Sequence, residues 1–479
     1  MAVAAAIGYS SISLYRDSHF GSTLDLATQA QTVWGYSHFK VIPNTVIGIP
    51  NLMGDHFNPI LMVLAPLFWI WNSASALLVA QAVLLAIAGV PVFLWGVQRI
   101  GQVAGLAFLG AFYMYWGILS GVLFDFHHVV FAVTAVSWAL YATLTNRNRL
   151  LFAMVGIAML TREDVALTLV ALGLYILVVQ RRYVLGAAIM IINAAWFAVL
   201  LGAVMPALSQ EPYRHWTYQK LGTGPADAVR HIVTQPIQSL ELLFTPIIKL
   251  RVWLASFGAF LFLPILSPIT LVAAPTFLER FWNDGPDFWT FHMQYSMPAA
   301  PILAFAAIDG AAQLGAAFPR RGPSWFAMRA AVAVLAASAL LCIAVNPLVE
   351  LGTYVSSTTA ADIQSCLDVI PPTASVAATQ NLLPHLATRT SVYQIPIQNT
   401  NGPTADPVTA GVEYIAIDIA TEGNGARFRD VVKEAFAAEY GVACSKELTV
   451  VLSRHATGRD LTGRLQRWLA GECDGRACL

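Results

Sequence analysis

Ionisable side chains in this chain gather in short polar segments that separate long apolar runs. Carboxylates, histidines and arginines occur together in RDSHFGSTLD, GDHFNP, FDFHHVV, TREDVA and ERFWNDGPDFWTFHMQY. An ionisable group at membrane depth costs roughly 2.5–3.5 kcal/mol on insertion scales, so such groups usually mark a functional site. Because these segments recur at alternate ends of the apolar runs, we expect them to form one pocket at one face of a membrane.

Two carboxylates in the first polar segment are candidates for a general base. Asp17 follows the opening apolar stretch, and Asp25 stands one helical turn before Gln29. A carboxylate within hydrogen-bond reach of a hydroxyl can remove its proton. The competing interpretation makes Asp17 an interfacial residue and Asp25 a helix cap.

Three further residues have the chemistry to bind a phosphate group: His56, His128 and Arg162. A protonated histidine donates charged hydrogen bonds, and a guanidinium matches phosphate oxygens better than an ammonium does. Glu163 and Asp164 would support Arg162 from the adjacent positions. Alternatively, Arg162 only neutralises these two carboxylates, and a lone histidine is more often structural.

Asp125 and His127 are a candidate pair of ligands for a divalent metal such as Mg²⁺ or Mn²⁺. Asp17, Asp25 or His56 could supply a third ligand. The spacing matches no specific metal motif, and Asp125 could equally orient a neighbouring histidine toward a phosphate.

The late polar segment offers a possible acceptor side of the pocket. It contains Glu279, Arg280, His292 and Tyr295 among aromatic rings of the kind that pack on sugars or lipid tails. The alternative is an ordinary aromatic belt at the membrane interface.

The composition identifies an integral membrane protein. Hydrophobic residues make up 57% of the 479 residues and charged residues only 11%, whereas soluble domains carry about 25% charged residues. A formal net charge of zero argues against a nucleic-acid partner. No P-loop, dinucleotide fingerprint, nucleophile elbow or Cys-x-x-Cys pair is present in the sequence.

The elements that must position these residues are membrane spans. Apolar runs occur at about 75–97, 102–121, 128–145, 149–161, 165–180, 183–205, 251–267, 297–314 and 325–346. A first helix is expected to end near Tyr15; this opening segment lacks signal-peptide features and could be truncated. A short return span is expected at 268–282. Together with the apolar runs, these two give about 11 predicted spans. The proline-bounded run 58–71 is short for a span and is expected to be re-entrant or interfacial.

Basic residues in short loops set the predicted orientation. Arg99, Arg147 with Arg149, Arg181 with Arg182, and Arg320 with Arg321 mark the cytoplasmic ends. The acidic and histidine segments then face outward, together with outer loops 16–57 and 207–250. A surface amphipathic helix is expected near 225–245.

Residues 351–479 differ in character from the membrane domain at 1–350. IPPTASVAAT, SVYQIPI, EYIAIDI and ELTVVLS are typical of short strands, and DIQSCLDVI and FRDVVKEAFAAEYG of amphipathic helices. This pattern predicts a small extracytoplasmic α/β domain and a tail. Its four cysteines, Cys366, Cys444, Cys473 and Cys478, could form two disulfides, with Cys473 near enough to Cys478 to pair locally, or could be free thiols.

Several of these segments together resemble one family of bacterial multi-pass membrane proteins. STLDLATQAQTVW, GDHFNPILMVLAPLFWIW, FDFHHVVFAV, TREDVAL and IPPTASVAATQNLLPHLATRTSVYQIP resemble elements of domain of unknown function two-thousand-seventy-nine. The resemblance extends from about residue 15 to 455. The family is grouped with the C-type glycosyltransferases (GT-C), which implies a mainly α, multi-pass fold in the bacterial cytoplasmic membrane.

The resemblance also implies a function and a catalytic residue. GT-C enzymes use a polyprenyl-phosphate sugar donor and an acidic base in the first outer loop, a role that maps best to Asp25, with Asp17 in reserve. The paired acidic signature of some relatives is absent, which leaves metal dependence open. The expected activity is sugar transfer to a lipid, glycan or protein acceptor. The alternative is a non-catalytic protein that binds or translocates lipid-linked glycans, although a transporter would be expected to show internal repeats and none is evident.

Overall fold

The computed structural model describes residues 1–210, 213, 215–317, 323–346, 357–398, 404–420 and 425–478. The chain forms two compact units. We call Met1–Ile12, Met53–Ile60 and Val79–Leu348 the helical unit, and Ser13–Leu52, Leu61–Leu78 and Val349–Leu479 the sheet unit. Most of the first outer loop thus belongs with the C-terminal strands. Arg320 and Arg321, which contributed to the predicted orientation, lie outside the described residues.

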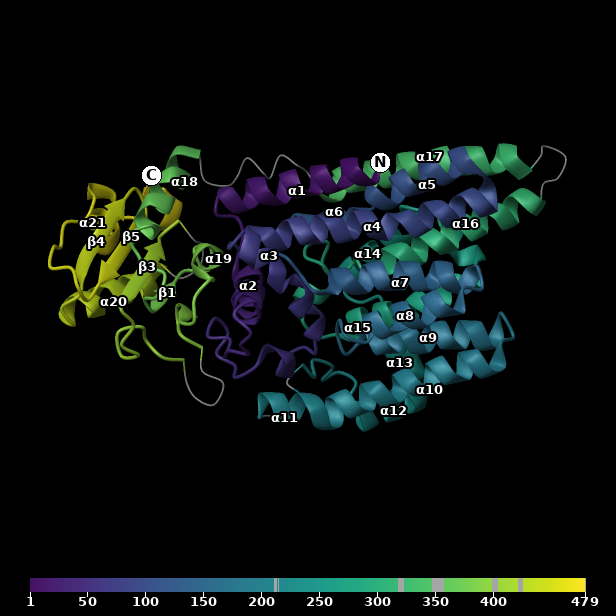
Figure 1. The fold of residues 1–479 in the computed structure, drawn as a ribbon, viewed down its shortest axis with the longest axis horizontal. Coiled ribbons are helices and arrows are strands. Elements are labelled where there is room, and N and C mark those ends of the chain that lie inside the picture. Colours follow the sequence, from purple (N-terminus) through teal and green to yellow (C-terminus); the bar gives the residue numbers. More distant parts are fainter. Residues whose placement is uncertain are drawn as a thin grey trace. The chain divides into compact units, whose positions relative to one another are not determined.

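The helical unit is a bundle of apolar helices (Figure 1). In chain order its helices are α5 (Gln102–Tyr113), α6 (Trp116–Val122), α7 (Val129–Leu144), α8 (Asn148–Ala158), α9 (Val165–Val178), α10 (Tyr183–Val199), α11 (Met205–Ser209), α12 (Pro225–Thr234), α13 (Pro236–Glu241), α14 (Ile247–Gly258), α15 (Ala274–Trp282), α16 (Ala299–Ala317) and α17 (Pro323–Val345). Two helices, α1 (Ala2–Ser18) and α4 (Ser75–Ile100), contribute residues to both units.

Four of the described helices are long and apolar enough to cross a membrane: Ser75–Ile100, Tyr183–Ser209, Ala299–Ala317 and Trp325–Val345. A fifth candidate is the pair α5 and α6, which bends by 45° at its break. The mainly helical, multi-pass architecture is therefore as predicted, but the number of about 11 spans is not confirmed. Helices α7, α8 and α9 are shorter than a full span.

The predicted pair of spans over 251–282 is replaced by shorter pieces. After α14 come two 3₁₀ turns, Leu263–Leu266 and Pro268–Ala273, and then α15. Pro264 and Pro268 stand at the starts of these turns, where a proline has no amide hydrogen to continue an α-helix. The run 58–71 is likewise short, with a 3₁₀ turn at Pro59–Leu64 followed by α3 (Ala65–Ile70). The expected surface helix near 225–245 is broken into α12 and α13 at Pro236.

Glycines allow α9 and α10 to pack closely in the helical unit. A Cβ atom on Gly173 would lie 2.8 Å from the Met190 backbone nitrogen, and one on Gly186 would lie 2.5 Å from the Leu177 backbone nitrogen. Small residues let apolar helices approach until their backbones touch, which maximises dispersion contacts in a medium without a hydrophobic driving force. This packing sets the position of the TREDVA turn that precedes α9.

The sheet unit contains a five-stranded sheet of order β2-β1-β3-β5-β4. Its strands are β1 (Val376–Ala378), β2 (Val392–Gln394), β3 (Tyr414–Asp418), β4 (Gly441–Lys446) and β5 (Thr449–Ser453). Strands β2, β1 and β3 are parallel, and β3, β5 and β4 are antiparallel. All residues of β3 and β5 are buried, as the apolar runs EYIAIDI and ELTVVLS suggest. Strand β4 was not predicted, because GVACSK is weakly apolar.

Helices complete this unit: α2 (Leu24–Ser37), α18 (Ser357–Leu367), α19 (Leu383–Leu386), α20 (Gly425–Ala437) and α21 (Gly463–Leu469). The cysteine pairing that the sequence left open is resolved into two disulfides, Cys366–Cys444 and Cys473–Cys478. Cys342 is a buried free thiol.

The first outer loop is fastened to the edge strand β2. The Thr45 hydroxyl donates to the Val392 carbonyl at 2.6 Å and accepts from the Val392 amide at 3.1 Å. The Gln31 side chain donates to the Thr390 carbonyl at 3.1 Å and accepts from the Thr45 amide at 2.9 Å. These bonds satisfy backbone groups that an edge strand would otherwise expose. They also fix α2, the helix that carries Asp25.

Candidate functional site

Glu163 lies at the centre of a polar cluster in the helical unit. This residue stands in the turn between α8 and α9, and its side chain is 1% exposed. One carboxylate oxygen is 2.8 Å from Nδ1 of His56, and the other accepts from the Phe57 amide at 3.1 Å. The Tyr213 hydroxyl donates to the first oxygen at 3.4 Å. The predicted residues His56 and Glu163 are thus direct partners.

The electrostatics of this pair favour charge on both partners. Burial alone would raise the pKa of Glu163, but the His56 and Arg162 charges and the His56 hydrogen bond outweigh burial and lower it to about 2. Burial opposes protonation of His56, yet the Glu163 carboxylate raises the pKa of His56 above its ordinary value. Both shifts favour the charged, hydrogen-bonded form of the pair.

Arg162 turns away from its neighbour Glu163 toward two other carboxylates. Its guanidinium lies 2.9 Å from Asp164 and 3.3 Å from Glu279. All three residues line a small cavity of about 30 Å³, whose wall also includes Arg280, Gln294 and Tyr295. The neutralising interpretation of Arg162 therefore has direct geometric support, and the guanidinium also faces a space large enough for one small polar group.

His128 approaches the cluster from the start of α7. Its ring centroid is 5.9 Å from that of His56, and Nδ1 lies 3.5 Å from the Asn58 side-chain amide. His127 and Asp125 lie on the same turn, where the Gln81 side chain accepts from the His127 amide at 2.9 Å. Burial lowers the pKa of His127 to about 3, so this imidazole is neutral at physiological pH.

Two residues of the cluster were not predicted from the sequence. Nε2 of His215 lies 2.7 Å from Asp55, and the His215 ring stacks on His56 with centroids 4.3 Å apart and planes 14° apart. Burial lowers the pKa of His215. Asp55, His56 and His215 form a three-residue group that could hold a metal among the described residues, whereas the expected pair Asp125 and His127 is not part of it. The polar segment PYRHWTY was the available signal, but nothing in the sequence relates it to GDHFNP.

The residues expected on the acceptor side differ in whether they could contact a substrate. Arg280 is 4% exposed, and its guanidinium donates to the carbonyls of Phe288 and Thr290 and to the Ser296 hydroxyl. These bonds fix the loop after α15, so Arg280 has a structural task. His292 is exposed, and Tyr295 stacks on Phe288 at 4.6 Å and lines the small cavity beside Arg162.

The two candidate bases lie in the sheet unit and have different surroundings. The Asp17 side chain is 5% exposed; it accepts from the Ser75 hydroxyl at 2.5 Å and lies 4.0 Å from His385. Asp25 is half-buried in the first turn of α2. The helix dipole stabilises a carboxylate there.

Comparison with known proteins places the chain in a family. The family described as a predicted membrane protein (DUF2079) matches residues 17–442. The chain belongs to the DUF2079 family. The resemblance noted from its sequence segments is thereby confirmed, and no curated protein sequence matches the chain significantly.

Solved structures show the fold of this DUF2079 protein. ArnT from Cupriavidus metallidurans bound to undecaprenyl phosphate is similar with a TM-score of 0.54 at 12% identity, over 95% of this chain and 98% of ArnT. The Archaeoglobus fulgidus oligosaccharyltransferase in complex with Zn and sulfate matches with a TM-score of 0.46 at 14% identity, over 95% of this chain and 73% of that chain. The likeness to ArnT shows that the two chains share a fold.

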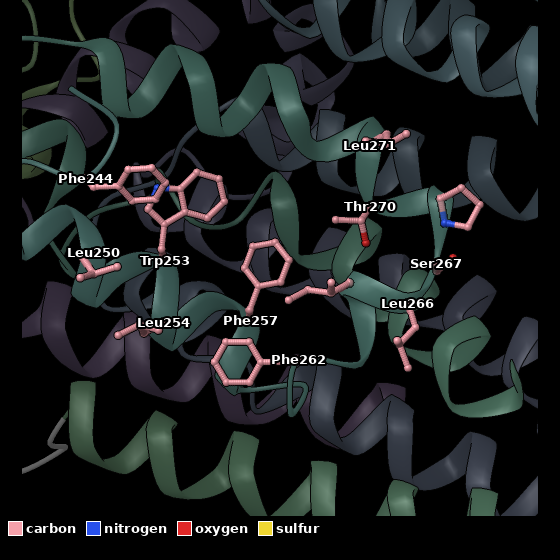
Figure 2. Close-up of a pocket in the computed structure, with 12 residues that line it drawn as sticks. Phe244, Leu250, Trp253, Leu254, Phe257, Phe262, Leu266, Ser267, Thr270 and Leu271 are labelled. Atoms are coloured by element: carbon pink, nitrogen blue, oxygen red, sulfur yellow. The ribbon is translucent and has the colours of Figure 1, made fainter. Parts of the chain in front are cut away.

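The DUF2079 protein also has an apolar cavity of about 620 Å³ in its helical unit. Figure 2 shows the rings of Phe244, Trp253, Phe257 and Phe262 on one side, with side chains of the two 3₁₀ turns on the other. Trp253 stacks on Phe277 of α15 at 4.4 Å. Because α15 also carries Glu279, one helix connects the wall of this cavity with the ion-pair partner of Arg162.

Proposed function

We propose that this DUF2079 protein transfers a sugar from a polyprenyl-phosphate donor to a lipid, glycan or protein acceptor at the outer face of the bacterial cytoplasmic membrane. The observation that carries the proposal is the shared fold with ArnT over nearly the whole of both chains. That relative was solved with undecaprenyl phosphate bound. Such a donor needs a place for its lipid tail, groups for its phosphate and a base for the acceptor.

The donor has two chemically different ends, and the helical unit offers a suitable region for each. The apolar cavity between α14 and the 3₁₀ turns suits several isoprene units, which gain free energy in proportion to the apolar area removed from water. Arg162, His56 and His128 are the groups for the phosphate. Glu163, Asp164 and Asp125 support them, and Glu163 does so by fixing the His56 ring.

Asp25 is the proposed general base, and Asp17 is the reserve. A base must be reachable by the acceptor hydroxyl, and Asp25 is half-buried whereas Asp17 is enclosed beside Ser75 and His385. Tyr295 and His292 remain candidates for the acceptor side. Arg280 contributes there by holding the loop that carries both of them.

The outward orientation has support from cysteine chemistry as well as from the arginine pattern. Cys366–Cys444 and Cys473–Cys478 are both disulfides. Disulfides persist outside the reducing cytoplasm, so the sheet unit is assigned to the extracytoplasmic side. Since Asp25 belongs to the same unit, the reaction is assigned to that side too.

The decisive variant is Asp25→Asn, which keeps the shape of the side chain and removes its basicity. The purified protein is supplied with a panel of polyprenyl-phosphate sugars and with membrane extract as the acceptor source, and released polyprenyl phosphate is measured. We expect the variant to lose roughly 10²–10⁴-fold in turnover while it binds undecaprenyl phosphate as the wild type does. Asp227→Asn, at a fully exposed carboxylate, is the matched control.

Two results would contradict the proposal in different ways. Unchanged turnover in Asp25→Asn would move the base to another residue, and Asp17→Asn would then be tested in the same way. Binding of the lipid phosphate without release from any donor would favour the alternative, a protein that binds or translocates lipid-linked glycans.

A further inference from the structure

We propose that Asp55, His56 and His215 form a binding site for a divalent transition metal, with Zn²⁺ as the ion that the ligands suit best. Each residue offers one ligand atom, and the three atoms lie within 4.8 Å of one another. They come from two distant segments of the helical unit, the turn after Met53 and the segment that follows α11. The proposal does not depend on sugar transfer.

The His56 ring is held as a metal-binding histidine usually is. Its Nδ1 is occupied by Glu163 at 2.8 Å, so Nε2 remains for an ion. A carboxylate on the second ring nitrogen fixes the tautomer and makes the imidazole a better ligand. Glu163 is itself fixed by the Phe57 amide and Tyr213, so the support for the ligand is already in place.

The other two ligand atoms lie within 4.8 Å of that of His56. Nε2 of His215 lies 2.7 Å from Asp55, and the His215 ring stacks on that of His56 with planes 14° apart, so one ring turns when both bind a single ion. Side-chain exposures of 11% for Asp55, 23% for His56 and 30% for His215 leave a path for an ion while limiting competition from water. An ion would replace the single Asp55–His215 hydrogen bond with a bond to each ligand.

Two independent features of the surroundings also favour a cation. His128 lies beside His56, and its buried Nε2 has no hydrogen-bond partner among the residues that the structure describes. Nearby carboxylates outnumber the permanent positive charges, because Arg162 is already paired with Asp164 and Glu279. A divalent ion would balance the charges of Asp55 and Glu163 in this partly buried region.

The turn that bears Asp55 is fixed in place before any metal binds. A Cβ atom on Gly54 would lie 2.5 Å from the Ser209 backbone nitrogen, so the turn that bears Asp55 packs directly on the end of α11. A preformed site loses less conformational entropy when an ion binds than a flexible one does.

The ligand set selects the class of metal. Two imidazoles and one carboxylate match Zn²⁺, which binds His and Asp ligands in tetrahedral sites, and three protein ligands leave one position open. Mg²⁺ and Mn²⁺ prefer oxygen ligands, so this site differs in chemistry from the Asp125–His127 pair expected from the sequence. With the ion bound, both ring nitrogens of His56 are occupied, so in the proposed function His56 would act on the donor phosphate through the open metal position and not directly.

The test measures the amount of bound Zn²⁺ and needs no sugar donor. The metal-site proposal therefore stands or falls independently of the proposed function. Full-length protein in detergent is stripped with a chelator, and Zn²⁺ binding is titrated against a chromophoric competitor with bound metal counted by mass spectrometry. We expect about one Zn²⁺ per chain. Binding should be lost in His56→Ala and His215→Ala and weakened roughly 10–100-fold in Glu163→Gln. His455→Ala, at a histidine that is 71% exposed, is the matched control.

A second measurement covers the case in which a variant fails to fold. Co²⁺ bound to the wild-type protein should give the visible absorption of a four-coordinate site with nitrogen and oxygen ligands, and Zn²⁺ should abolish it. Wild-type protein without this absorption and without stoichiometric Zn²⁺ would overturn the proposal. So would folded His56→Ala and His215→Ala variants that bind Zn²⁺ as tightly as the wild type.

Discussion

Asp17 and Asp25 show how surroundings separate two identical side chains at the residue scale. Asp17 is enclosed between Ser75 and His385, whereas Asp25 is half-buried at the start of α2. Burial limits how closely an acceptor hydroxyl can approach Asp17, whereas the partial exposure of Asp25 leaves its carboxylate reachable. The two residues are therefore suited to different tasks.

His385 predicts how the stability of the sheet unit depends on pH. Its ring packs on Phe20 at 4.2 Å, and burial lowers its pKa even though Asp17 opposes that shift. The folded state thus favours the neutral ring. The contribution of His385 to stability is complete above the unfolded pKa of about 6.5 and decreases as the pH falls through that value.

The measurement is the melting temperature of the purified protein at pH 7.5 and at pH 5. We expect the wild type to lose more stability on acidification than His385→Gln, whose side chain does not titrate. His38→Gln, at an exposed histidine in the same unit, is the control and should follow the wild type. Equal losses in the wild type and His385→Gln would contradict the assignment.

At the scale of elements, the polar cluster depends on the close packing of α9 against α10. The turn that carries Arg162 and Glu163 leads directly into α9, and the segment that carries His215 follows the continuous helix Tyr183–Ser209. Gly173 and Gly186 allow the two helices to touch. The arrangement of the cluster therefore depends on residues that take no part in its chemistry.

Gly186→Leu should destabilise the protein by roughly 1–3 kcal/mol, because the new side chain would overlap the backbone at Leu177. The readout is thermal unfolding in detergent, together with Zn²⁺ binding if the site depends on this packing. Gly156→Ala is the matched control, since a Cβ atom at this position would have no neighbouring atom within 4 Å. A Gly186→Leu protein as stable as the control would show that the helices can separate at little cost.

At the scale of the whole molecule, the protein combines a membrane-embedded helical unit with a disulfide-bonded sheet unit. The proposed donor has a long apolar tail and a charged head, and the helical unit has a suitable region for each. Apolar side chains between Phe244 and Phe262 line the 620 Å³ cavity. The groups suited to a phosphate, His56, His128 and Arg162, lie in the turns that join the helices.

Filling the cavity should discriminate between donors by chain length. Leu254→Trp places a large ring against Trp253 and Phe257, so we expect a several-fold higher KM for a long polyprenyl donor and little change for a short-chain analogue. Ile191→Trp, at a residue of α10 that is 67% exposed, is the control. The same KM increase for both donors would mean that the tail binds elsewhere.

Hydropathy and local patterning in the sequence determined the class of the protein. Long apolar runs require a membrane, strand-like segments such as EYIAIDI require a sheet, and the quoted motifs are sufficient for the family. They also identified His56, Arg162 and Glu163 as residues of interest. The number of spans was harder to predict, because prolines divide apolar runs such as 251–282 into pieces shorter than a membrane.

Only the tertiary structure decided which polar residues meet. His215 joins Asp55 across 160 residues of sequence, and His56 joins Glu163 across 107. Local spacing determines the face of a single helix or strand, but contacts between distant segments depend on how the helices pack, including the glycine contact at Gly54. For that reason the sequence offered Asp125 and His127 only as one possible metal pair, whereas the three possible ligand atoms that lie close together belong to Asp55, His56 and His215.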